Sequence, residues 1–388
     1  MQKSFCQHHI ERFFGRFAWD MPLDLALSRY FKENKALGSK DRKEVGSVIY
    51  DMVRWKSLLD WEVGEHSSWH ERLSLYQSER FSRLRETSSV PEAVRIGVPE
   101  WLLRRLIVRF GADRGREIAR ILNSEAPLTV RANSAKTTRE QLFSLWKEHY
   151  SIQFCKMAPH GIQFAKREPL FTLPEFKEGL FEVQDEGSQL VAQEVGAKPG
   201  HLVLDFCSGS GGKTLGFAPA MEGKGQIFLH DIRPRLLIEA KKRLRRAGIQ
   251  NGQFLSPDHP QLKKLKGRCD WVLIDVPCSG TGTLRRNPDQ KWRLQESDIE
   301  RFVSLQRTIA EEALLYLKPG GHLVYATCSL LKEENEDQID WLLSQKTLTL
   351  VKPPLLLAPE QGGMDGFFSA CLRMPPSKNI PTDLYCTP

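Results

Sequence analysis

The residues best suited to chemistry are two cysteines, Cys278 and Cys328, each of which follows an apolar run and precedes a serine. The runs, 271–276 and 321–327, are expected to be parallel strands joined by one helix over 297–317. Such strands are adjacent and end at the same edge of a sheet, so both thiols should lie in one cleft. The alternative is that both are buried structural thiols, as most free cysteines are.

A pair of thiols in one cleft suits covalent catalysis on a pyrimidine. Carbon 5 of cytosine is too electron-poor to attack a methyl sulfonium. A thiolate that adds to carbon 6 makes carbon 5 nucleophilic, and loss of the carbon 5 proton with elimination of the thiolate then completes the cycle. The attacking cysteine must be ionised, and the base must be unpaired or flipped out of a duplex.

A glycine-rich turn, 207–214, follows the expected buried strand 202–206 and precedes a helix. A strand–glycine–helix unit presents backbone N–H groups and a positive helix end to an anionic or nucleotide-like ligand. Its spacing fits two patterns. From Asp205 it contains D-x-C-x-G-x-G, as in AdoMet-dependent methyltransferases, and from Cys207 it contains C-x4-G-K-T, a P-loop that lacks its first glycine.

Acidic residues lie at the carboxyl ends of three more of the expected strands: Asp231, Asp258 and Asp275. Asp231 is placed to accept hydrogen bonds from ribose hydroxyls, although an aspartate there also commonly caps the next helix. The apolar run that ends at Asp275 resembles a Walker B strand and favours the P-loop, whereas Cys207 and Asp231 argue against it.

From residue 184 onward strands alternate with helices, which predicts βαβ units and a doubly wound parallel sheet of the α/β class. In such a sheet ligands bind beyond the carboxyl ends of the strands. The alternating tail, 366–374, is expected to add an antiparallel edge strand. The predicted strands are 202–206, 226–230, 252–256, 271–276 and 321–327, and the predicted helices are 234–247, 297–317 and 333–344.

The amino-terminal half is organised differently. Residues 22–57 have helical apolar spacing, and 77–99 are polar, contain two prolines and are expected to form a linker. Further helices are expected over 100–110 and 113–122. Between 128 and 181 short apolar runs alternate with prolines and glycines, which suggests a small α+β module.

The composition is that of a soluble protein with a modest basic excess. The chain has 388 residues, a net charge of +8 and a pI near 9.0, which favours a polyanionic partner. Neither a signal-like apolar segment nor a run of the roughly 18–20 apolar residues that span a bilayer is found. We therefore expect a cytoplasmic protein without a membrane partner.

The cysteines form no C-x2-C pair, so no metal site is expected, and without a secretion signal they should be reduced. There are eight of them: Cys6, Cys155, Cys207, Cys269, Cys278, Cys328, Cys371 and Cys386.

Several motifs resemble those of one family, the Sun/Nop-type RNA cytosine-C5 methyltransferases, and within it the bacterial RsmB-like 16S rRNA enzymes. The resemblance extends from about Glu182 to Met374. It is specific because the motifs occur in the family's order and on the expected strand ends. They are Val183–Leu190, Cys207–Thr214, Asp275–Gly282, Arg285–Trp292, Thr327–Ser329 and Asp365–Ala370.

The resemblance implies roles for these residues. Cys328 would be the nucleophile that adds to carbon 6, Cys278 would help to release the product by taking the carbon 5 proton, and Asp275 would orient or protonate the cytosine ring. AdoMet would be held by Cys207, Ser208, Gly209, Ser210, Gly211, Gly212, Lys213, Asp231, Asp258 and Asp275.

The chain departs from the family pattern at three places. Ser208–Ser210 replaces the usual Ala-Ala-Pro, Val276 replaces an alanine, and Asp258 lies in Ser-Pro-Asp-His where Gly-Asp is commoner. Small residues keep the turn compact, so we expect cofactor binding to survive.

The resemblance also implies three domains. They are a short NusB-like helical domain over 1–90, a small α+β RNA-binding subdomain over 91–180, and a Rossmann-like methyltransferase domain over 181–388. In the loop that follows Cys278 we expect backbone phosphates to contact Arg285, Arg286 and Lys291.

The implied activity is methyl transfer from AdoMet to carbon 5 of a cytosine in RNA, with 16S rRNA as the expected substrate and tRNA as the nearest alternative. A non-catalytic RNA-binding factor for ribosome assembly is a second alternative, and a P-loop NTPase that binds Mg-ATP is a third. Neither DNA nor an obligate protein partner is expected.

Overall fold

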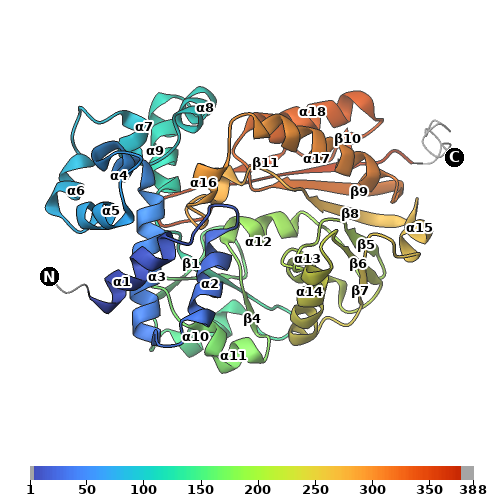
Figure 1. Ribbon diagram of the computed structural model, residues 1–388. Helices are drawn as coiled ribbons and strands as arrows, with labels where there is room; N and C mark the ends of the chain where they lie inside the picture. The colour runs from blue at the N-terminus through green and yellow to red at the C-terminus, as the bar shows by residue number, and fades with distance from the viewer. Residues whose placement is uncertain (1–3, 377–388) are drawn as a thin grey trace. The chain divides into compact units, whose positions relative to one another are not determined.

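The computed structural model describes residues 4–376, which divide into two compact units (Figure 1). The first comprises the described residues up to Glu125 together with the segment Thr283–Asp298. The second comprises Ala126–Gly282 and the described residues from Ile299 onward. The segment Thr283–Asp298 therefore interrupts the second unit in sequence but packs within the first.

The first unit is helical, as the sequence predicts. On α3 the residues Val45, Ile49, Met52 and Val53 are fully buried and form the centre of the helical core. The helices are α1 (Phe5–Phe14), α2 (Leu23–Glu33), α3 (Ser39–Arg54), α4 (Lys56–Val63), α5 (Trp69–Tyr76), α6 (Glu79–Leu84), α7 (Glu92–Ile96), α8 (Glu100–Phe110), α9 (Ala112–Leu122) and, in the inserted segment, α16 (Gln290–Arg293).

The predicted linker over 77–99 is wrong, because α6 and α7 form there. Phe81, Leu84 and Val90 are buried in the helical core, and Ile96 is buried as well. These sparse apolar residues are enough to fold the segment onto the core although its overall composition is polar.

The second unit contains the predicted small α+β module. Its strands form an antiparallel sheet in the order β2-β3-β1-β4, and the succession β1-α10-β2-β3-α11-β4 is that of a ferredoxin-like fold. Its core contains Trp146, Phe164 and Phe181. The elements are β1 (Leu128–Ala132), α10 (Arg139–Trp146), β2 (Ile152–Phe154), β3 (Gly161–Phe164), α11 (Pro174–Lys177) and β4 (Phe181–Val183).

The large sheet confirms the doubly wound α/β prediction. Its strand order is β10-β12-β9-β8-β5-β6-β7, with β7, β6, β5, β8 and β9 parallel. The strands are β5 (Leu202–Asp205), β6 (Gln226–His230), β7 (Gly252–Leu255), β8 (Cys269–Asp275), β9 (Leu317–Thr327), β10 (Thr349–Leu350), β11 (Leu355–Leu357) and β12 (Phe367–Arg373). The predicted tail strand, β12, is antiparallel to β9, but it is not an edge because β10 and β11 both pair with it.

Helices pack on both faces of this sheet, since alternate side chains of a strand point to opposite faces. Leu204 and Val272 share a core with α17 and α18, whereas Val203 and Leu273 share another with α14. The helices of this part are α12 (Glu186–Gln193), α13 (Thr214–Phe217), α14 (Pro234–Ala247), α15 (Gln261–Leu265), α17 (Asp298–Leu314) and α18 (Glu336–Gln345). Among residues 4–376 no helix is both long and apolar enough to span a membrane.

The domains predicted over 1–90, 91–180 and 181–388 stay a prediction. The predicted boundary near residue 90 lies inside the helical unit, and the boundary near 180 lies inside the second unit.

Candidate active site

The two cysteines meet, as the adjacency of their strands predicts. β8 and β9 pair in parallel with Asp275 opposite Ala326, so their carboxyl ends lie side by side. The Sγ atoms of Cys278 and Cys328 are 3.4 Å apart, at hydrogen-bonding distance, and both residues are partly exposed free thiols. Cys386 lies outside the described residues.

Close backbone packing holds the loops of the two cysteines together. The amide of Gly282 donates to the carbonyl of Cys328 at 2.8 Å, and the amide of Gly366 donates to the carbonyl of Gly282 at 2.9 Å. A Cβ atom at Gly282 would lie 2.2 Å from the carbonyl oxygen of Gly366. Only glycine permits this approach, which brings the Asp275–Gly282 and Asp365–Ala370 motifs into contact.

The two thiols differ in electrostatic environment. The hydrogen bond with Cys328 raises the pKa of Cys278 well above that of a free thiol, and burial and the charges of Cys328 and Glu334 raise it further. Cys278 is thus the thiol that keeps its proton when Cys328 is ionised. Burial, together with Asp205, Asp275 and Asp231, also raises the pKa of Cys207, so this third cysteine stays neutral.

An ion pair between a buried lysine and a partly exposed aspartate lies at the same edge of the sheet. The ammonium of Lys213 donates to Asp275 and lies 5.8 Å from the centre of the Phe367 ring. Burial lowers the pKa of Lys213, but Asp275, Cys328 and Asp205 outweigh it and the net pKa is raised. Lys213 therefore stays positive, and by the same interaction with Cys328 its charge favours the thiolate form of that cysteine.

The glycine-rich turn begins at the end of β5 and is held by hydrogen bonds from several elements. Gly209, with a φ of +53°, donates its amide to Asp231 at 2.9 Å. Arg243 of α14 donates to the carbonyl of Ser210 at 3.0 Å, and Arg131 of β1 donates to the carbonyl of Gly212 at 3.3 Å. The predicted turn thus forms, and these hydrogen bonds help to fix its conformation.

Polar atoms in this turn fit a ligand with donor groups. The buried Oδ1 of Asp205 and the buried Oγ of Ser208 have no hydrogen-bond partner among the described residues. The other oxygen of Asp205 accepts from Thr214 at 2.6 Å, and burial raises the pKa of Asp205 to about 7. A cationic amine at Oδ1 would satisfy this carboxylate and lower its pKa.

Asp231 lies at the end of β6, beside the turn. It accepts from the amide of Gly209 and from the guanidinium and amide of Arg233. Burial raises the pKa of Asp231, but these bonds outweigh it and the net pKa is lowered, so the carboxylate is ionised. Asp258, in contrast, is exposed in the loop after β7.

Two of the three expected phosphate contacts after Cys278 are wrong. The side chains of Arg285 and Lys291 are 0% and 1% exposed. The ammonium of Lys291 donates to the carbonyls of Arg54 at 2.8 Å and Gly97 at 2.6 Å, and to the side-chain oxygen of Asn123. Arg285 and Lys291 fix the inserted segment to the helices of the first unit, and because they are buried, RNA cannot reach them. Arg286, in contrast, is half-buried.

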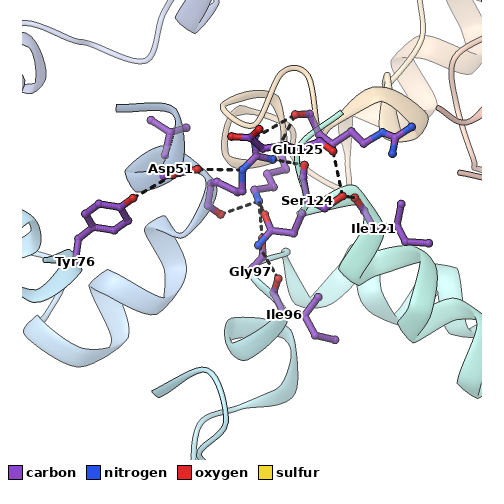
Figure 2. Close-up of polar contacts among 12 residues, drawn as sticks. Asp51, Tyr76, Ile96, Gly97, Ile121, Ser124 and Glu125 are labelled. Atoms are coloured by element: carbon purple, nitrogen blue, oxygen red, sulfur yellow. Dashed lines mark hydrogen bonds and ion pairs between the residues drawn. The ribbon is translucent and has the colours of Figure 1, made fainter. Parts of the chain in front are cut away.

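Figure 2 shows the surroundings of this anchor in the helical unit, with Asp51, Tyr76, Gly97 and Ser124 labelled. Arg54 donates from its guanidinium to the carbonyls of Ser124 at 2.7 Å and Arg285 at 3.3 Å. Tyr76 donates to Asp51 at 3.0 Å. The inserted segment is thus held through backbone carbonyls and buried side chains.

Sequence reasoning missed the polar residues behind the cysteines. Ser279, Thr281, Ser329 and Glu334 are fully buried and bonded to one another. The only signal was that a serine follows each cysteine. Glu334 lies near the start of the helix predicted over 333–344, and its burial depends on tertiary contacts.

The fold and the site define a structural class, a Rossmann-like α/β domain with paired cysteines at the strand ends. The sequence matches the family described as 16S rRNA methyltransferase RsmB/F over residues 192–373, and the RsmF/B-like ferredoxin-like domain over 98–170. Ribosomal RNA small subunit methyltransferase B of Klebsiella pneumoniae is 34% identical over 293 residues, which are 71% of this chain and 65% of that protein.

The protein of the same name from Shewanella oneidensis is 30% identical, over 75% of this chain and 70% of its own length. A crystal structure of a methyltransferase homolog from Pyrococcus horikoshii is 29% identical, with a TM-score of 0.65 over 73% of this chain and 97% of that one. The chain belongs to the RsmB/F family, which confirms the predicted resemblance, and it spans 65% of the length of the Klebsiella relative.

Proposed function

We propose that this protein transfers a methyl group from AdoMet to carbon 5 of a cytosine in RNA, with 16S rRNA as the substrate. The observation that carries the proposal is the pair of sulfur atoms, 3.4 Å apart, at the strand ends that also hold the Lys213–Asp275 ion pair. Membership of the RsmB/F family supports rRNA as the substrate.

In the proposed cycle Cys328 attacks as the thiolate, which the charge of Lys213 favours. A bond forms between its Sγ and carbon 6 of the cytosine, and the electron pair moves toward carbon 5. Asp275, with its side chain 35% exposed, is placed to orient the ring or to share a proton with it. The neighbouring Lys213 holds this carboxylate in position.

Release requires a base at carbon 5, and Cys278 is the candidate. Once Cys328 is a neutral thioether, neither its hydrogen bond as an acceptor thiolate nor its negative charge raises the pKa of Cys278, and only burial and Glu334 still do. Cys278 therefore loses its own proton to solvent more readily than before. The Cys278 thiolate then takes the carbon 5 proton. The bond between carbon 6 and sulfur breaks, and Cys328 leaves as a thiolate.

AdoMet, when bound, supplies the methyl group as an electrophilic sulfonium. We assign its binding to the turn Cys207–Lys213, with Asp231, Asp258 and Asp275 as the acids. The unpartnered oxygen of Asp205 is suited to its amino group. Ile232, which follows Asp231 and is 73% exposed, offers an apolar surface to a purine ring.

The alternatives differ in what they require. A tRNA substrate keeps the chemistry and changes only RNA recognition. A non-catalytic assembly factor needs neither thiol, so this alternative does not explain why the two thiols lie close together. A P-loop NTPase needs the lysine of the turn for phosphate, whereas Lys213 is already paired with Asp275.

The test is to incubate the protein with methyl-labelled AdoMet and unmodified 16S rRNA or tRNA, and to map any 5-methylcytosine. Label at one rRNA cytosine is expected. Label in tRNA alone would overturn the substrate, and no label in either RNA or in an assembling small subunit, despite AdoMet binding, would favour the assembly factor.

Cys328→Ala should abolish methylation and leave AdoMet affinity nearly unchanged, because the nucleophile is lost while the turn is intact. Single-turnover methylation and cofactor titration measure the two quantities. Detectable turnover would exclude Cys328 as the nucleophile.

Cys278→Ala should trap RNA covalently on Cys328, because addition proceeds and elimination does not. The trapped species is a denaturant-resistant, slower-migrating band on a gel, and the double variant with Cys328→Ala is the matched control that should lack it. A folded, AdoMet-binding variant without the band would argue against a release role.

A further inference from the structure

One carboxylate lies behind both cysteine loops. Glu334 is 0% exposed, and one of its oxygens accepts from the amide of Ser279 at 2.8 Å and from Gln306 at 2.9 Å. The other oxygen accepts from the hydroxyls of Ser279 and Ser329. Ser279 and Ser329 directly follow Cys278 and Cys328, so one side chain holds the residue next to each thiol.

The hydroxyl groups around Glu334 also bond to one another. The Oγ atoms of Ser279 and Ser329 are 3.1 Å apart, and Thr281 Oγ1 lies 3.2 Å from each of them. Thr281 Oγ1 also accepts from the amide of Leu330 at 2.8 Å. The two loops therefore share one hydrogen-bond network, in which Glu334 is the acceptor for both.

Other contacts fix Glu334 in place. Tyr325 of β9 donates to the backbone carbonyl of Glu334 at 2.7 Å, and its hydroxyl lies 3.2 Å from the side-chain oxygen of Gln306. Gln306 of α17 also donates to the carbonyl of Pro277 at 3.0 Å. Asn335, the next residue, donates to the carbonyl of Ser329 at 2.9 Å. Hydrogen bonds from β9 and α17 thus fix the position of Glu334.

The donors to Glu334 are neutral: an amide N–H, two hydroxyls and a side-chain amide. A carboxylate with two oxygens accepts all four bonds, whereas an alanine would leave these buried donors unsatisfied and open a space between the loops. A buried polar network of this kind specifies one arrangement of the groups it joins.

We propose that Glu334 is a positioning residue that holds Cys278 and Cys328 at hydrogen-bonding distance from each other. It touches neither thiol and acts through Ser279 and Ser329. The catalytic consequence rests on the proposed methyl transfer, but the geometry can be measured without that reaction.

The measurement uses phenylarsine oxide, whose arsenic binds two thiols only when they are close and releases one water as two As–S bonds form. The full-length protein should bind it at the cysteine pair, and Cys278→Ala should remove that binding. Glu334→Ala should weaken binding at least about 10-fold and lower kcat for methylation about 100-fold, because displacement of reacting groups by about 1 Å has an effect of this size.

Two variants separate positioning from stability. Glu334→Gln preserves the size and most of the hydrogen bonds, so it should restore most of the arsenical binding and of kcat. Asp270→Asn removes a carboxylate at the other end of β8, where Asp270 accepts from the amide of Leu202 and pairs with Lys318, and it should leave both unchanged.

Normal arsenical binding by folded Glu334→Ala would overturn the proposal, and so would normal kcat. If Glu334→Ala does not fold, the double variant Ser279→Ala and Ser329→Ala replaces it, with an expected loss of about 10-fold in both measurements, and unchanged values again overturn the proposal. If the wild-type protein binds the arsenical but methylates no RNA, the proposed function fails while the positioning role stands.

Discussion

Two buried lysines, one in each unit, have opposite electrostatic environments. Lys213, in the sheet unit, is paired with the carboxylate of Asp275, which outweighs burial and raises the pKa of Lys213. Lys291, in the helical unit, donates to two backbone carbonyls and an amide oxygen. Burial, with the charge of Arg54, lowers the pKa of Lys291 well below that of a free lysine.

This difference shows that a basic residue in a motif of the chain does not by itself indicate a ligand contact. Both lysines lie in segments that the sequence associates with binding. Lys213 is at the carboxyl ends of parallel strands, where its charge can act on a substrate. Lys291 has all three N–H groups directed at protein oxygens, so its contribution is to the packing of the helical unit.

Of the substitutions at the two lysines, Lys213→Met should have the larger effect on methylation. Loss of the cation leaves Asp275 without its partner and removes the charge that favours the Cys328 thiolate, so kcat should fall about 10²–10³-fold. The free energy of unfolding should change by less than about 1 kcal/mol, because Asp275 is partly exposed and water can solvate it.

Single-turnover methylation and denaturant unfolding measure these two quantities. Lys224→Met, at an exposed loop position before β6, is the matched control and should have normal kcat. A large loss of stability with normal kcat in Lys213→Met would give this lysine the structural role that we assign to Lys291.

Lys291→Met should lower the stability of the protein rather than its kcat. Three buried oxygens, on Arg54, Gly97 and Asn123, lose their donor, and the helical unit should be destabilised by about 3 kcal/mol. Denaturant unfolding measures the change, with Lys43→Met on the exposed face of α3 as the control, expected within about 0.5 kcal/mol of wild type. Unchanged stability would show that this anchor is not needed.

The two lysines should also respond differently to pH. For Lys291 the folded-state pKa is lowered, so above that pKa the unfolded state binds more protons than the folded state. The free energy of unfolding therefore rises with pH up to about 10.5, the pKa of a free lysine. For Lys213 the pKa is raised, so its contribution persists to about 10.5 and is lost only above its folded pKa.

The difference in free energy of unfolding between wild type and Lys291→Met, measured against pH, isolates the contribution of Lys291. Below pH 10 the wild type should gain stability with rising pH at up to about 1.4 kcal/mol per pH unit more than the variant. Parallel pH profiles of the two proteins would mean that Lys291 has the same pKa in both states.

The sequence predicts the parts of the site that depend on order along the chain. The cysteines meet because each follows a strand and those strands, β8 and β9, are adjacent and parallel. The strands can be read from apolar runs, but their connection contains α16 as well as the one predicted helix, α17. Glu334 could not be found in this way, because its four donors come from residues 279, 306 and 329 and only the folded chain brings them together.

Contacts between residues distant in sequence also explain why the predictions for the helical unit were wrong. Phe81 and Leu84 lie in a polar stretch, and their burial depends on partners distant in sequence. Lys291 and Arg285 lie in a basic loop that follows the Asp275–Gly282 motif, which favoured a surface role. Their burial depends on α3 and on the segments at 97 and 123, which lie roughly 160 residues or more before the loop.

The smallest effect concerns Arg286, which is half-buried in the loop where Arg285 and Lys291 are fully buried. If Arg286 contacts an RNA phosphate, Arg286→Ala should weaken RNA binding a few-fold for any sequence. The slope of log affinity against log salt concentration should also fall by about 1, because one fewer counterion is released. Arg286→Lys keeps the charge and should keep the slope. An unchanged slope in Arg286→Ala would mean that Arg286, like Arg285 and Lys291, has a structural role and contacts no phosphate.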